Sequence, residues 1–262
     1  FSRGQCTWDG GGGDDQWANA ANWAGDTLPT PSDAVILDNR YVSGSYTVVL
    51  PAGTTTVTVQ SLFIQPAAGV SIEVVLPAAN LAIPAFVAQG AVYGLDVQAG
   101  GIFRNASGIS SGQSLVIGDS LRIGNGGRYV HQTRASHAGS ISQILSRAPG
   151  TETGILEFDV PGTTGYTISV SGRVYGSLVL SATAAGGTRT YASSGSSVFR
   201  VRGDFRMNNG VRYNLNLNAG MVIERNLQVD SAAFNISSGG DNTVVQIHKD
   251  VCVSGTITES SD

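Results

Sequence analysis

Lysine, glutamate and long apolar runs are scarce in this chain of 262 residues. Lys249 is the only lysine, only five of the 19 acidic residues are glutamate, and charged residues make up 13% of the sequence. Because helix surfaces favour Lys and Glu, this composition argues against a mainly helical protein. No apolar run reaches the roughly 18 residues that a membrane-spanning helix needs. The net charge of −4 also argues against nucleic-acid binding through a basic surface.

Cysteine is almost absent, and its spacing excludes a common type of metal site. The two cysteines, Cys6 and Cys252, lie near opposite ends of the chain and form no C-x-x-C pair. They can form a disulfide only if the two ends meet in the fold. In an elongated fold we expect them to be free, or bonded to a neighbouring chain.

The abundant residues are those of short strands and tight turns. The chain contains 35 glycines, and strand-sized runs such as Tyr46–Leu50 and Ser71–Leu76 alternate with Pro- and Gly-rich turns. No long stretch has the 3.6-residue periodicity of an amphipathic helix. We therefore expect an all-β protein.

A degenerate repeat of alternating apolar and polar residues, closed by a Gly- or Asn-rich turn, runs through the chain. Its first apolar positions are Leu95, Leu121, Phe205, Leu227 and Val251, and the neighbouring members of this set are 26, 22 and 24 residues apart. Repeats of about 20–50 residues are typical of stacked supersecondary units. We predict a right-handed parallel β-solenoid (β-helix) in which these five side chains form one interior column. The alternative is an antiparallel β-sandwich, but no two-residue hairpin turn joins the alternating runs.

The organisation along the chain follows from this repeat. Residues 1–40 hold all three tryptophans and a glycine-rich loop, and we expect them to form an N-terminal cap. Residues 41–262 are predicted to form the coils, with an excursion near 131–153 where the pattern breaks. The strand-like pattern persists to the last residue, so we expect the coils to continue beyond 262.

Two candidate sites lie in the predicted cap. Asp9, Asp14 and Asp15 flank a four-glycine loop, and carboxylates on such a loop can bind Ca²⁺. The same acids can instead serve only as turn residues.

The three tryptophans of the cap, Trp8, Trp17 and Trp23, have two interpretations. Exposed, they would offer a carbohydrate-binding platform. Buried, they would cover the first open coil, which is favoured because large aromatic side chains dominate core energetics.

The excursion concentrates basic residues and histidines. It contains Arg128, His131, Arg134, His137 and Arg147, with no acidic residue between Arg122 and Glu152. Such a cluster could hold an anion or a metal. The missing acid argues against a general acid–base pair, and we expect a solvated loop that docks on the solenoid.

Neither catalytic motifs nor cofactor-binding motifs occur in the sequence, and we predict a protein that is not an enzyme and needs no cofactor. Three Asp-(Ser/Thr)-apolar triplets resemble bacterial O-glycosylation acceptors. Their hydroxyl residues are Thr27, Ser120 and Ser231.

Several segments resemble large secreted surface proteins of Bacteroidetes. They are Thr7–Trp17, Ala21–Trp23, Leu28–Pro29, Gly126–His131, Arg147–Glu152, Glu157–Pro161 and Arg173–Leu178. Proteins of that group are typically exported by the type IX secretion system. The resemblance implies a β-helical protein on the bacterial outer surface or released from it, an adhesin or filament component, with no catalytic residues to carry over.

Two functions from different classes remain open at this point. The first is a non-catalytic extracellular or cell-surface β-solenoid that serves as adhesin, stalk or assembly subunit. The second is a glycan-binding or glycan-cleaving β-helix module. The expected partners are other surface or secreted proteins, glycans, or further copies of the chain. Nucleic acid is not expected as a partner.

Overall fold

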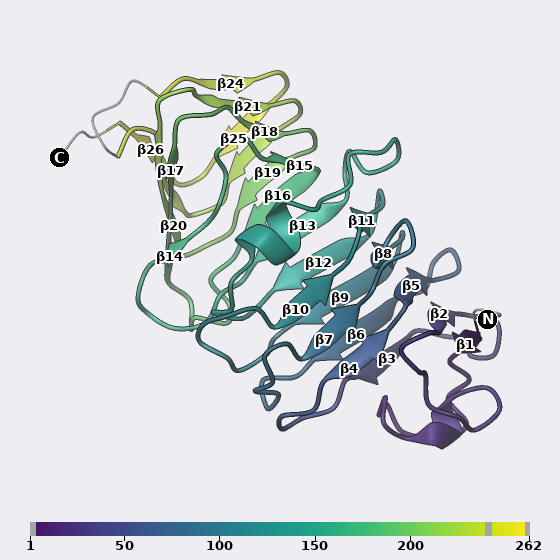
Figure 1. The fold of residues 1–262 in the computed structure, drawn as a ribbon. Coiled ribbons are helices and arrows are strands. Elements are labelled where there is room, and N and C mark those ends of the chain that lie inside the picture. Colours follow the sequence, from purple (N-terminus) through teal and green to yellow (C-terminus); the bar gives the residue numbers. More distant parts are fainter. Residues whose placement is uncertain (1–3, 239–242, 260–262) are drawn as a thin grey trace.

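The computed structural model describes residues 4–238 and 243–259, and it forms a parallel β-solenoid. Every pairing between the described strands is parallel, and each strand pairs with one from the preceding or the following coil. This excludes the antiparallel sandwich. Figure 1 shows the coils stacked along one axis from the N-terminal to the C-terminal end. The right-handed sense of the coils stays a prediction.

One sheet of nine strands, which we call the spine sheet, runs the length of the solenoid (Figure 1). In chain order its strands are β3 (Tyr46–Val49), β6 (Ile72–Leu76), β9 (Gly101–Asn105), β12 (Arg128–His131), β13 (Ile155–Phe158), β16 (Ser177–Leu180), β19 (Phe205–Met207), β22 (Leu227–Val229) and β25 (Val251–Val253).

The amino half has two further sheets. The amino five-stranded sheet contains β1 (Gln5–Thr7), β2 (Ala34–Asp38), β5 (Ser61–Gln65), β8 (Leu95–Val97) and β11 (Leu121–Ile123). The amino three-stranded sheet contains β4 (Val57–Val59), β7 (Phe86–Ala88) and β10 (Leu115–Ile117). Since β2 already pairs with β5, the parallel coils begin before residue 41.

The carboxyl half repeats this arrangement. The carboxyl five-stranded sheet contains β14 (Tyr166–Thr167), β17 (Arg189–Gly195), β20 (Val211–Leu217), β23 (Ala233–Asn235) and β26 (Thr256–Thr258). The carboxyl four-stranded sheet contains β15 (Val174–Tyr175), β18 (Phe199–Val201), β21 (Met221–Ile223) and β24 (Val245–Ile247). Two single-turn helices complete the described elements: the 3₁₀-helix η1 (Ala20–Asn22) and the π-helix η2 (Ala138–Ser142). Neither is long or apolar enough to span a membrane, and no other helix occurs in the described ranges.

Alternation along each strand builds the core. In β6, Ile72, Val74 and Leu76 are buried and the residues between them are partly exposed. Because successive side chains point to opposite faces, the inward positions of successive coils stack into columns. In the spine sheet, Phe103 of β9 lies above Tyr129 of β12, with ring centroids 5.8 Å apart.

The repeat spacing is confirmed, but the single interior column is wrong. Leu95 pairs with Leu121, Phe205 with Leu227, and Leu227 with Val251, at the predicted intervals. The first pair lies in the amino five-stranded sheet and the other three residues lie in the spine sheet. The repeat therefore occurs in two different sheets, on two different sides of the coil. The first four side chains are buried, whereas Val251 is 52% exposed, because no described coil covers the strand β25.

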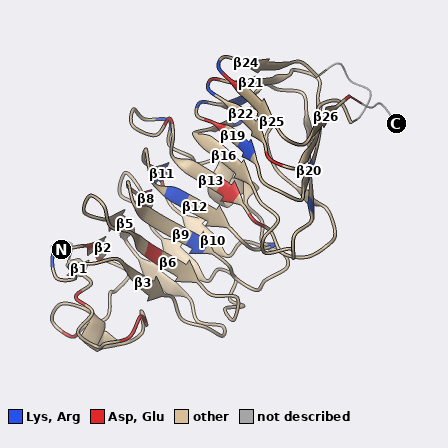
Figure 2. Cartoon of the chain, turned by 180° about the vertical axis from the view of Figure 1, so that it is seen from behind, with Lys and Arg blue, Asp and Glu red and all other residues tan. Residues whose placement is uncertain are grey.

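The outer face of the spine sheet carries charge pairs between coils. Figure 2 shows acidic residues on β6 and β13 and basic residues on β12 of this face. Arg104 donates through Nε to Glu73 at 2.7 Å, and Arg128 donates to Glu157, each across neighbouring coils. The first pair therefore links the coils of β6 and β9, and the second links those of β12 and β13.

Candidate functional site: a cleft at the interrupted coil

The regular coils are interrupted between β12 and β13, which are neighbours in the spine sheet. The connecting residues 132–154 contain η2 but no strand. Their one sheet-like contact is an isolated parallel bridge from Leu145 to Leu121 of β11. The amino three-stranded sheet ends at β10, and the carboxyl five-stranded sheet begins only at β14. The interruption therefore leaves one side of the solenoid without a continuous sheet.

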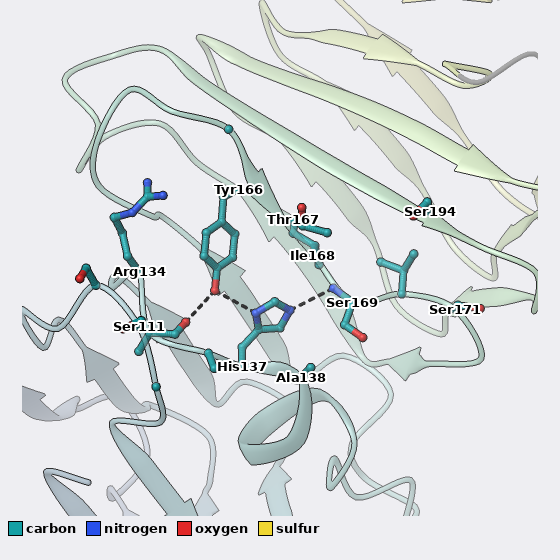
Figure 3. A pocket seen from close by; sticks show the side chains of 16 residues that line it. Ser111, Arg134, His137, Ala138, Tyr166, Thr167, Ile168, Ser169, Ser171 and Ser194 are labelled. Carbon is teal, nitrogen blue, oxygen red and sulfur yellow. Dashed lines mark hydrogen bonds between the residues drawn. The ribbon is translucent and has the colours of Figure 1, made fainter. Parts of the chain in front are cut away.

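A cleft of about 630 Å³ lies at this interruption (Figure 3). Residues 110–112 and residues 134–138 of the excursion line it. Residues 165–171, including β14, and Ser194 of β17 complete the lining. Among the described residues that line the cleft, none carries a carboxylate.

Two histidines and a tyrosine form a buried hydrogen-bonded cluster beneath the cleft. His137 Nδ1 lies 2.9 Å from the Tyr166 hydroxyl, and His131 Nε2 lies 3.0 Å from the same oxygen. His131 Nε2 is also 3.1 Å from the carbonyl of Ala135, and Tyr166 donates to that carbonyl at 2.8 Å. His131 is fully buried, and His137 and Tyr166 are 5% and 9% exposed. The expectation of a solvated loop is therefore wrong for these histidines.

The hydrogen bonds determine the tautomers of both histidines. The backbone N–H of Ser169 donates to His137 Nε2 at 3.0 Å, as Figure 3 shows, so the proton of neutral His137 lies on Nδ1 and points to Tyr166. For His131 the proton belongs on Nε2, because that atom has two acceptors and Nδ1 has no partner. The Tyr166 hydroxyl then accepts from both rings and donates to Ala135, which uses its full hydrogen-bonding capacity.

Burial keeps this cluster neutral. Burial, reinforced by neighbouring His137, lowers the pKa of His131 from 6.5 to about 3. Burial and the positive charge of Arg173 lower the pKa of His137 from 6.5 to about 4. Burial also raises the pKa of Tyr166 well above its usual value. At neutral pH the cluster holds no charge, and no nitrogen facing the cleft is free to take a proton.

Three arginines surround this neutral cluster. Arg189 is 1% exposed, donates through Nη1 to the carbonyl of Gly162, and places its guanidinium 5.9 Å from the ring centroid of Tyr166. Arg173 lies close enough to His137 to affect its pKa. Arg134 lines the cleft itself and is half-buried. None of the three forms an ion pair with a described carboxylate, so the site has an excess of positive charge.

The alternating pattern of β12 indicates that His131 is buried. Tyr129 and His131 are two residues apart in one strand, so they share a face, and a large aromatic at Tyr129 indicates the inner face. The fold places His131 directly between Asn105 and Phe158 in an inner column of the spine sheet. Tyr166 had no comparable signal, because it lies 35 residues further along the chain.

The structure does not bring the three predicted calcium ligands together. Asp14 accepts from the backbone of Gln16 and from the side-chain amides of Asn22 and Asn19, at 2.7–3.1 Å. Asp9 accepts from the backbone of Gly11 at 3.0 Å, and Asp15 is exposed. In residues 4–238 and 243–259 no three acidic, His or Cys side chains form a cluster suited to a metal. The geometry supports the turn-forming role of these acids and gives no support for bound calcium.

The three tryptophans pack against one another in the interior. Trp8, Trp17 and Trp23 are 2%, 3% and 0% exposed. Trp23 packs edge-on against both of the others, at centroid distances of 5.1 and 4.7 Å, and its indole N–H donates to the carbonyl of Trp17. The carbohydrate platform is therefore not formed, because no indole face is open to a sugar ring. The covering of an open coil stays a prediction that this burial supports.

The glycosylation candidates all lie in turns. Thr27 follows Asp26, Ser120 follows Asp119, and both aspartates have left-handed φ angles, of +52° and +56°. Ser231 itself has a φ of +46°. Thr27 and Ser231 are exposed and Ser120 is half-buried, with its hydroxyl donating to the carbonyl of Val92. Modification at these hydroxyls stays a prediction.

The two cysteines are free thiols at opposite ends of the solenoid. Cys6 lies on β1 at the N-terminal end, where burial and the charges of Asp33 and Asp9 raise its pKa to about 11. Cys252 is exposed on β25 at the other end. The ends do not meet, so a disulfide between these two residues of one chain is excluded.

Comparison with protein-family models, with curated proteins and with solved structures finds no match to this chain. The functional argument therefore depends on the geometry of the cleft and of the solenoid.

Proposed function

We propose that the chain is a non-catalytic β-solenoid of a bacterial cell-surface or secreted protein, and that it acts as an adhesin whose ligand binds in the cleft at the interrupted coil. The observation that carries this proposal is the cleft itself. It is large enough for a small ligand or part of a polymer. It lies on a stack of coils that the nine-stranded spine sheet holds together.

The chemistry of the cleft supports binding rather than catalysis. General acid–base catalysis needs a group that exchanges a proton with the substrate near the working pH. His137 and Tyr166, the titratable side chains in the cleft lining apart from Arg134, are hydrogen-bonded to each other and have strongly shifted pKa values. The lining residues supply hydroxyls, backbone groups and the guanidinium of Arg134, which are groups that recognise a ligand.

A cleft-blocking variant tests the proposal. Ser194 is an exposed residue of β17 at the cleft wall, so Ser194→Tyr fills the cleft without changing the core. Ser43→Tyr, at an exposed position between β2 and β3, is the matched control. We expect the purified chain to bind to a glycan array or to whole cells. Ser194→Tyr should abolish this binding and Ser43→Tyr should preserve it.

The same experiment tests the non-catalytic role. Bound glycans recovered after long incubation should have unchanged masses in mass spectrometry. Chain shortening or an eliminated product would refute the adhesin proposal in favour of a glycan-cleaving module. Equal binding by both tyrosine variants would show that the cleft is not the binding site.

A further inference from the structure

The arginines around the cleft differ from those that form ion pairs along the solenoid. Seven contact a carboxylate: Arg40, Arg104, Arg122, Arg128, Arg200, Arg206 and Arg225. The arginines around the cleft, Arg134, Arg173 and Arg189, form no such pair with any described acid, although Arg189 is buried and the other two are half-buried. A buried or half-buried cation is costly when it has no counter-charge. Arg147, Arg202 and Arg212 also form no ion pair with a carboxylate among the described residues, but Arg134, Arg173 and Arg189 are the ones that lie around the neutral cluster at the cleft.

Arg134 lies where two hollows adjoin. The 630 Å³ cleft and a second hollow of about 280 Å³ share Ser110 and Arg134 in their linings. Within the described residues the guanidinium of Arg134 forms one hydrogen bond, from Nη1 to the carbonyl of Thr164 at 3.5 Å, the outer limit for such a bond. Figure 3 shows the side chain extended beside Tyr166 at the side of the cleft. Most of its five donors are available to a ligand.

Asp159, whose hydrogen-bond partners line the second hollow, forms no ion pair with Arg134. Asp159 is 4% exposed, and its two oxygens accept from Gln132 Nε2 at 3.0 Å and from the backbone of Ala184 at 2.9 Å. Gln132 and Ala184 line the second hollow together with Arg134, whereas Asp159 is not part of the lining. Both oxygens of Asp159 are therefore occupied by other partners, and Arg134 is left to a ligand anion.

The remaining lining suits a polyhydroxylated ligand. Seven hydroxyl side chains line the larger cleft in addition to Tyr166: Ser110, Ser111, Ser136, Thr167, Ser169, Ser171 and Ser194. Hydroxyl groups both donate and accept, so they can pair with sugar hydroxyls of either orientation. A planar guanidinium binds carboxylate or sulfate groups through two parallel hydrogen bonds.

We propose that the two hollows form one binding groove for an acidic polysaccharide, in which Arg134 pairs with the carboxylate or sulfate group of one sugar unit and the serine-rich cleft binds the neighbouring units. This inference rests on the proposed adhesin function and adds the chemical class of its ligand. The buried guanidinium of Arg189, behind the ring of Tyr166, adds positive potential to the same site without contacting the ligand.

Calorimetric titration with defined oligosaccharides tests the proposal. The probes are oligomers of a uronic acid, sulfated oligomers of a neutral sugar, and the same neutral oligomers without sulfate. We expect at least one acidic series to bind and the neutral series to bind at least about tenfold more weakly, as expected for loss of a charge-assisted pair. Comparison of the two acidic series identifies whether carboxylate or sulfate is the natural group.

Two arginine variants with equal charge change provide the specificity control. Arg134→Gln should weaken binding of the acidic oligomer at least about tenfold. Arg212→Gln, on the exposed side of β20 and also without a carboxylate partner, should leave it unchanged. Circular dichroism and the unfolding midpoint of each variant verify that the fold is intact.

The outcomes separate this inference from the adhesin proposal. If neutral and acidic oligomers bind equally, Arg134→Gln binds like the parent and Ser194→Tyr abolishes binding, the cleft is a binding site and the acidic specificity is refuted. If Arg134→Gln and Arg212→Gln weaken binding by the same factor, the weaker binding reflects the change in net charge of the protein, and the specific role of Arg134 is refuted. If no glycan binds and Ser194→Tyr has no effect on cell binding, both proposals fail.

Discussion

Acid should destabilise this protein through the two buried histidines, and the size of the effect follows from their pKa values. Folding lowers the pKa of His131 from 6.5 to about 3 and that of His137 from 6.5 to about 4. Between the native and the unfolded pKa of each histidine, the unfolded chain binds a proton that the native state excludes. The contribution of these histidines to the free energy of unfolding is therefore present above pH 6.5 and is lost as the pH falls below it. From pH 7 to pH 5 the loss is about 2 kcal/mol for each histidine and about 4 kcal/mol for both.

Replacement of one histidine should remove its share of this pH dependence. His131→Phe suits the site sterically, because the ring lies among Tyr129, Phe158 and Tyr166 at centroid distances of 6.4, 5.5 and 5.9 Å. The variant loses the hydrogen bonds of His131 Nε2 and should be less stable by about 1 kcal/mol at pH 7. Its further loss between pH 7 and pH 5 should be about 2 kcal/mol instead of about 4 kcal/mol.

The measurement is urea-induced unfolding followed by circular dichroism at pH 7 and pH 5. His248 is exposed on the turn after β24, so His248→Asn is the matched control and should keep the full pH dependence. The Cε1–H signals of His131 and His137 should also fail to titrate in this range by NMR. The reasoning is refuted if His131→Phe keeps the parent pH dependence, or if His131 titrates near pH 6.5.

Three further changes test the packing of the coils, each by the free energy of unfolding in urea. Gly210→Ala should cost about 2–4 kcal/mol, because φ is +79° and the added Cβ would overlap the carbonyl of Gly187. Its control, Gly186→Ala, has a φ of +77° but open space around the added Cβ, so it should cost only about 1 kcal/mol. Phe205→Ala should cost about 3–5 kcal/mol, because this buried ring packs against the rings of Tyr213 and Phe234. Asn80→Leu should cost about 2–3 kcal/mol, because the fully buried amide satisfies three backbone groups that a leucine would leave unpaired. Equal costs for the two glycine variants, or losses below 1 kcal/mol for the other two, would contradict these packing arguments.

The architecture of this protein was accessible from local patterns. Alternation along a strand and the recurrence of turns are properties of neighbouring residues, so they predicted strands, coils and the spacing of Leu95 from Leu121 and of Phe205 from Leu227. The break in the pattern near residues 131–153 also coincides with the interrupted coil. His131, Arg134 and His137 in this break belong to a cluster that could hold an anion or a metal, but the sequence favoured a solvated loop, and the burial of the two histidines shows that this expectation was wrong for them.

Local patterns could not predict which sheet a strand joins when two segments with similar sequences belong to different sheets. The turns after Val97 and after Met207 have similar sequences, but the first follows the amino five-stranded sheet and the second follows the spine sheet. Alternation tells which side of a strand faces inward and says nothing of which sheet the strand joins. That choice depends on how many residues each coil uses in its other turns.

The sequence by itself determined a chain of short alternating strands that must stack, since no coil can bury its own apolar residues. Only the tertiary structure decided that His131 and His137 meet the hydroxyl of Tyr166 inside the solenoid, and that Arg134 lines a cleft without a counter-charge. The reason is that Tyr166 lies 29 residues beyond His137 and 35 beyond His131, so their proximity depends on the path of the interrupted coil. Solvation, charge and hydrogen bonding at the site follow from that proximity.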